Sequence, residues 1–116
     1  GGTPVKKGFS WRPLLAEEWQ RILGFDFTPG DRALIELLAK GGNQPLSWKE
    51  FENQLPQATF PRLYHRLNTF DSLGIPARIN QLLRGVGAPF RFACTKRRNL
   101  NDPNRPVVKY AICLKE

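Results

Sequence analysis

The spacing of apolar residues changes abruptly in this chain at residues 85–89, Gly-Val-Gly-Ala-Pro. After this point apolar and polar residues alternate in two runs, one beginning at Phe90 and the other at Val108. Such alternation is typical of strands that bury one face. Before this point apolar residues recur three and four positions apart, which is typical of helices. The sequence therefore predicts a mainly α fold with a C-terminal β-hairpin.

Capping and stop signals divide the first part into expected helices. Thr28 precedes Pro29 at the start of one helix, and Ser47 forms a capping box with Glu50 at the start of the next. We expect helices over residues 13–23, 31–40, 47–55, 62–70 and 77–84, after a flexible lead over residues 1–9. The first helix should begin after Ser10. Its expected buried stripe consists of Leu15, Trp19, Ile22 and Leu23.

The length of 116 residues is typical of one domain, so we expect residues 10–116 to form one. The chain begins with Gly1-Gly2 and contains no Met, so we interpret it as a fragment of a longer protein. No apolar run approaches the roughly 20 residues of a membrane span, and no secretory signal is visible.

Alternation places Cys94 and Cys113 on opposite faces of the hairpin, which favours free thiols. We expect an intracellular location: cytoplasm or nucleoid, or the nucleus of a eukaryote.

Positive charge is concentrated in the second half of the chain. The chain has 18 Lys and Arg against 10 Asp and Glu, a net charge of +8. Residues 1–59 carry seven basic and seven acidic residues, whereas residues 60–116 carry eleven basic and three acidic residues. Such asymmetry favours a polyanionic partner, either nucleic acid or an anionic membrane surface, over the alternative that the charge only keeps the chain soluble.

Residues that carry catalytic chemistry are sparse. His65 is the single histidine, and no cysteine or second histidine stands at metal-ligand spacing from it. Neighbouring glutamates on the expected helices point in different directions and do not form an acid-base pair. We therefore expect no enzyme activity, no metal site and no cofactor.

The order of these elements resembles that of the winged helix-turn-helix superfamily, with one extra helix at the N-terminus. Residues 31–40 and 47–55 would be the first two helices of the motif, and the hairpin over residues 90–114 would be the wing. The resemblance implies binding of nucleic acid, and it favours double-stranded DNA over RNA. The parent would be a regulatory, replication or plasmid-maintenance protein.

Two expected helices compete for the role of recognition helix, where a plain winged helix has one. We favour the helix over residues 62–70, which follows a short turn and carries Arg62, His65, Arg66 and Asn68. The alternative is the helix over residues 77–84, which carries Arg78, Asn80, Gln81 and Arg84. Within the wing, a phosphate-binding role is expected for Lys96, Arg97, Arg98 and Arg105.

Two other functions remain open. A winged helix can bind protein instead, and an exposed patch containing Trp11 or Trp19 would favour docking to another domain of the parent or formation of a homodimer. The domain could also hold nucleic acid for a larger enzyme. A membrane is not an expected partner.

Overall fold

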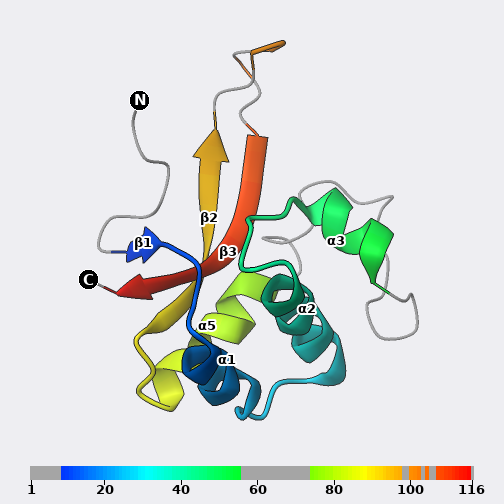
Figure 1. Cartoon of the computed structure of the whole chain (residues 1–116). Coiled ribbons are helices and arrows are strands. Elements are labelled where there is room, and N and C mark those ends of the chain that lie inside the picture. Colours follow the sequence, from blue (N-terminus) through cyan, green and yellow to red (C-terminus); the bar gives the residue numbers. More distant parts are fainter. Residues whose placement is uncertain (1–8, 56–73, 98–99, 103, 105–106, 116) are drawn as a thin grey trace.

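The computed structural model describes residues 9–55, 74–97, 100–102, 104 and 107–115. In these residues it is a small α+β domain with four helices and a three-stranded antiparallel sheet, whose strand order is β1-β3-β2 (Figure 1). In chain order the elements are β1 (Phe9–Trp11), α1 (Ala16–Leu23), α2 (Pro29–Lys40), α3 (Trp48–Gln54), α5 (Ile75–Gly85), β2 (Phe90–Arg97) and β3 (Val107–Lys115).

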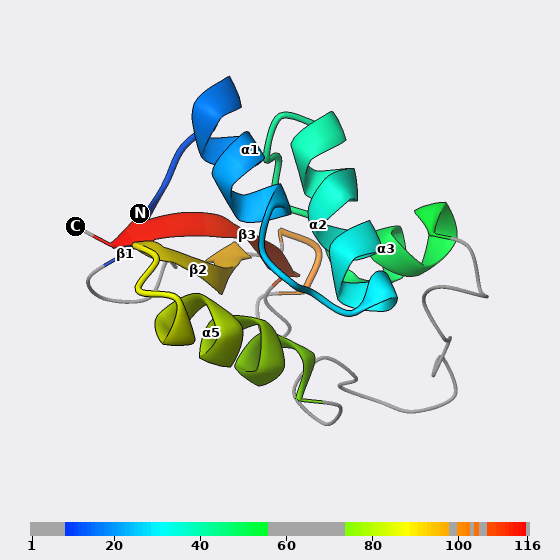
Figure 2. The ribbon, with the colours of Figure 1, turned by 90° about the horizontal axis from the view of Figure 1, so that it is seen from below.

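The predicted hairpin is confirmed, but its second face is buried in part as well, at Ala111 and Cys113. Phe92 lies opposite Ile112, and Cys94 lies opposite Tyr110. Figure 2 shows the strands between α5 and the pair of helices α1 and α2. Apolar side chains from helices and strands fill the interior; those fully or almost fully buried include Ile22, Leu34, Ile35, Leu38, Phe51, Ile79, Leu83, Phe90, Phe92 and Ile112.

Local capping signals predicted α2 and α3 well. The Thr28 hydroxyl accepts the amide hydrogen of Asp31 at the start of α2. Ser47 and Glu50 form the predicted capping box of α3, each side chain accepting the other residue's amide hydrogen. The helix expected over residues 77–84 is confirmed as α5, whereas the one expected over 62–70 lies outside the described residues.

The N-terminal part differs from expectation. Ser10 lies in β1, which pairs with the outer edge of β3, and α1 begins only at Ala16. Pro13 disfavours helical geometry at the residue before it, and the Glu18 carboxylate accepts the Leu15 amide hydrogen at 2.8 Å, which fixes the later start. Leu15 is therefore an extended cap residue and 57% exposed, so its expected place in the buried stripe was wrong.

The outer edge of β3 is completed by separate pieces of chain. β1 covers its end near Leu114, and Leu46 exchanges two backbone hydrogen bonds with Tyr110 farther along. Between them the buried Asn43 side chain accepts the Ile112 amide hydrogen at 3.0 Å and donates to the Ile112 carbonyl at 2.8 Å. Asn43 thus takes the place of a strand residue.

The two cysteines are free, as predicted. Cys113 is buried on the face opposite Phe90 and Phe92, beside Trp11 in the neighbouring strand. Burial, and secondarily Cys94, raise the pKa of the Cys113 thiol to about 11, so this thiol stays protonated at neutral pH.

Candidate nucleic-acid interface

Helix α5 presents one polar face to solvent. It begins after Gly74, whose positive φ of 69° suits glycine, with Pro76 in the first turn. Ile79 and Leu83 are buried, and their neighbours on the opposite face of the helix are exposed. These exposed residues are Ala77, Arg78, Gln81, Arg84 and Gly85. The helix contains no acidic residue, so this exposed face carries only basic and uncharged residues.

Arg78 joins the start of α5 to the start of α2. Its Nε and Nη2 each donate to a carboxylate oxygen of the buried Asp31, both at 2.7 Å. The hydrogen bonds to this carboxylate raise the pKa of Arg78. The arginine side chain is still 51% exposed, but its charge is compensated. Arg78 therefore positions α5 on the domain and adds little net charge to its surface.

Arg84 lies two turns farther along the same face and is exposed. Its Nε donates weakly to the Asn80 carbonyl at 3.4 Å, and it makes no ion pair with any described residue. Of the two arginines expected to bind DNA from this helix, Arg84 is thus the one whose charge remains uncompensated in the described structure.

Arg91 lies close to this site, at the start of β2. Its Nη1 donates to the carbonyls of Ala88 and Phe90 at 2.8 and 2.6 Å, which holds the side chain beside the end of α5. Burial, and then the charge of Arg84, lower the pKa of Arg91. The two arginines are therefore near enough to repel each other, and a bound anion would relieve this repulsion. Arg91 was not among the predicted binding residues, because its position fits the alternating pattern of a strand.

Asn80 couples α5 to the hairpin. Its side chain accepts the Phe92 amide hydrogen at 2.7 Å and donates to the Phe92 carbonyl at 3.0 Å. The exposed face of α5 and the strand that leads toward the basic loop are therefore held in one orientation. Nothing in the sequence predicted this contact, because an asparagine in a helix is usually a surface residue.

The outer end of β2 carries the first part of the predicted wing. Lys96 lies opposite Val108 and Arg97 lies opposite Val107, at the end of the hairpin that extends away from the helices (Figure 1). The other predicted DNA-binding residues lie outside the described residues: Arg62, His65, Arg66, Asn68, Arg98 and Arg105. The expected flexible lead, except for Phe9, also lies outside them.

A run without acidic residues covers this whole region. Between residues 72 and 101 there is no Asp or Glu, and there are six Lys and Arg. Outside this run two basic side chains have acidic partners: Arg12 contacts Glu18 at 2.8 Å, and Lys109 contacts Glu50 at 3.2 Å. This run was visible in the sequence and marks the same segment as the geometry does.

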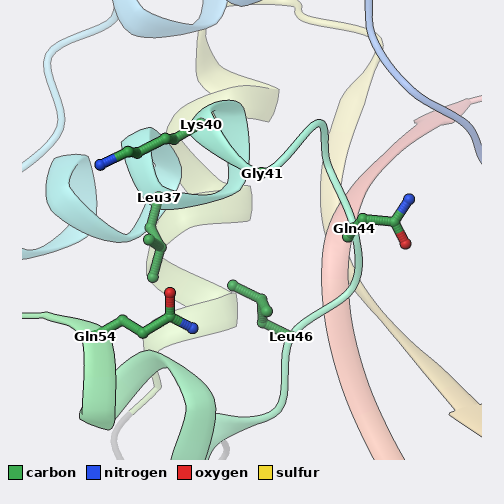
Figure 3. Close-up of a pocket in the computed structure, with 6 residues that line it drawn as sticks. All are labelled: Leu37, Lys40, Gly41, Gln44, Leu46 and Gln54. Atoms are coloured by element: carbon green, nitrogen blue, oxygen red, sulfur yellow. The ribbon is translucent and has the colours of Figure 1, made fainter.

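A cavity of about 400 Å³ lies elsewhere, between the end of α2 and α3. In Figure 3 the side chains of Leu37, Leu46 and Gln54 converge on it, whereas Lys40 and Gln44 point away. It contains no pair of titratable groups. Among the residues that the structure describes, no group of His, Cys, Asp or Glu could hold a metal ion.

The tryptophans make internal contacts. The Trp11 indole donates to the Asn43 carbonyl at 2.6 Å, and the Trp48 indole donates to Glu52 at 2.7 Å. Trp19 packs against the core, and all three side chains are partly buried. They do not form the exposed aromatic patch that would favour protein docking.

No protein-family model, curated protein or solved structure matches this chain. Within the described part of the chain, none of the helices has the length and apolar character needed to cross a membrane.

Proposed function

We propose that this domain is a winged helix-turn-helix module that binds double-stranded DNA. The topology supports the fold assignment. Leu46, between α2 and α3, pairs with β3 on the side away from β2. In the described residues a helix, an isolated strand bridge at Leu46, two helices and a hairpin occur in this order, an order that resembles the winged helix. Residues 56–73, between α3 and α5, lie outside the described residues. In this arrangement β1 and α1 are additions at the N-terminal end.

The observation that carries the functional proposal is the continuous segment 75–97. It joins an acid-free helix with an exposed polar face to a strand that ends in Lys96 and Arg97. Asn80 fixes one part to the other, and in this proposal one duplex contacts both. Phosphates would bind Arg84 and the wing, and Gln81 can read a base edge from the exposed face of α5.

We assign α5 the role of the groove-binding helix, since it leads directly into the wing and Arg78 anchors it to α2. The helix predicted over residues 62–70 remains a hypothesis. The tryptophan contacts give no support to the protein-docking alternative, and a role as the nucleic-acid-holding part of a larger enzyme is compatible with this proposal.

Fluorescence anisotropy with a labelled duplex of mixed sequence, measured over a range of salt concentrations, tests the proposal. If about six basic groups contact phosphate, the logarithm of affinity should fall with the logarithm of salt with a slope of about −5. The variant Arg84→Ala should weaken binding and reduce this slope by about one. Lys40→Ala, which removes an equal charge from the exposed end of α2, is the matched control and should bind like the wild type.

Two results would contradict the proposal. Absence of binding at low salt would refute DNA binding and direct attention to a protein partner. Equal losses in Arg84→Ala and Lys40→Ala would refute the assigned surface, because they would indicate attraction by net charge alone.

A further inference from the structure

Leu100 is the most exposed large apolar residue of the described structure. It is 89% exposed, and the other two exposed large apolar side chains are Leu15 and Val86, at 57% and 49%. Leu15 and Val86 occupy helix ends, where chain geometry determines their positions. Leu100 instead lies between β2 and β3, outside any helix or strand whose packing would require an apolar side chain.

The surroundings of Leu100 present it outward. The strands of the hairpin extend beyond the helices (Figure 1), and Leu100 belongs to the few described residues between them, 100–102 and 104. Nearby, one oxygen of the Asp102 carboxylate accepts the Asn104 amide hydrogen at 3.2 Å, which forms a local turn. Asp102 is the one acidic residue in the sequence between the two strands. Lys96 and Arg97 end the strand that leads to it. Leu100 is thus an exposed apolar side chain in a segment whose sequence is rich in Lys, Arg and Asn.

We propose that Leu100 is a wedge that enters the minor groove of bound DNA and partly unstacks one base step. This inference rests on the proposed DNA binding and specifies the form of the duplex: one that is kinked at a flexible step. The narrow minor groove admits a single side chain, and apolar residues inserted between base pairs bend DNA in this way. Leu100 would lose its exposure to water, and the kink would bring phosphates toward the basic wing.

An anionic membrane also attracts basic residues with an apolar neighbour, but the size of the apolar group favours DNA. Even a myristoyl chain binds a membrane only marginally and reversibly, and one leucine buries far less hydrocarbon. A base step, in contrast, is opened by a single side chain. One exposed leucine suits a wedge better than an anchor.

Two duplexes of the same mixed sequence test the inference, one fully paired and one with a central mismatch that is already partly unstacked. Wild-type protein should bind the mismatched duplex about tenfold more tightly, because the unstacking cost is lower there. Leu100→Ala should lose most of this preference and also the bend, measured by energy transfer between dyes at the duplex ends. Leu100→Met, which keeps an apolar side chain of similar size, should retain both, and Val86→Ala is the control for an exposed residue elsewhere.

The results separate this inference from the proposal beneath it. If wild type and Leu100→Ala bind both duplexes alike, with the same salt slope, DNA binding stands and the wedge is refuted. If the wild type does not bind DNA, both are refuted. Binding to vesicles of phosphatidylserine and phosphatidylcholine that depends on Leu100, without any mismatch preference on DNA, would also overturn the wedge.

Discussion

The replacement Asn43→Ala provides the most demanding test of the fold. Asn43 lies fully buried after α2, with a positive φ of 63°, a conformation that asparagine tolerates better than alanine. Its amide bonds both main-chain groups of Ile112 and donates to the Arg12 carbonyl at 2.8 Å. The replacement removes all three hydrogen bonds and leaves the Ile112 groups buried without partners.

The expected loss follows from these contacts. A buried donor or acceptor left without a partner costs about 1–3 kcal/mol, and two such groups of Ile112 give about 3–4 kcal/mol. Water can reach Arg12, which is exposed, so its carbonyl adds little. The positive φ adds about 1 kcal/mol for alanine. The free energy of unfolding should therefore fall by about 4–5 kcal/mol, a large part of the 5–15 kcal/mol typical of a domain.

Urea denaturation followed by tryptophan fluorescence measures this loss, with two variants for comparison. Asn43→Gly removes the same hydrogen bonds without the alanine backbone cost, and should be about 1 kcal/mol more stable than Asn43→Ala. Asn80→Ala removes the corresponding clamp on Phe92, but Asn80 is only partly buried. Water can replace its amide, so we expect a loss of about 1–2 kcal/mol.

The relative stabilities of the three variants test the role assigned to Asn43. If Asn43→Ala costs less than about 1.5 kcal/mol, or no more than Asn80→Ala, the buried amide does not complete the edge of the sheet. If Asn43→Gly is less stable than Asn43→Ala, the left-handed backbone at this position is wrong.

Two further predictions concern titratable groups. Brief alkylation of native protein near pH 8 should modify Cys94 and spare Cys113, whose thiol burial keeps protonated; peptide mass spectrometry measures both, and equal rates would contradict the burial of Cys113. The pKa of Glu50 is lowered from 4.5, first by the Ser47 amide hydrogen bond and also by Lys109. A carboxylate with a lowered folded-state pKa stabilises the fold above its unfolded-state pKa, and this contribution disappears as pH falls through the folded-state value. Thermal unfolding of the wild type should therefore lose more stability than Glu50→Gln as the pH falls from neutral to below the ordinary glutamate range; parallel curves would refute the contribution.

Sequence patterns predicted what depends on neighbours in the chain. The caps of α2 and α3, and the face of the hairpin that packs on the core, follow from residues a few positions apart. β1 could not be predicted in this way, because Phe9–Trp11 is a strand only where the edge of β3 offers it hydrogen bonds. Leu15 was misplaced for a related reason: helical spacing does not reveal that Glu18 sets a later start.

In the candidate site, too, some features could be predicted from the local sequence and others could not. Arg84 and the basic end of β2 could be chosen from charge and spacing. The carboxylate that holds Arg78 comes from α2, 47 positions away, and the contact between Asn80 and Phe92 joins a helix to a strand. Such contacts depend on tertiary packing, which no local pattern contains.

The position of β3 at the centre of the sheet also has a consequence for folding. Phe9–Trp11, Asn43 and Leu46 all complete their main-chain hydrogen bonding on a strand made of residues 107–115. During synthesis, these earlier segments emerge from the ribosome well before their common partner does. Helices α1 and α2 can form early from local contacts, but the sheet can close only when the last strand has left the exit tunnel. The domain should therefore complete its folding late, in one step that joins both ends of the described chain.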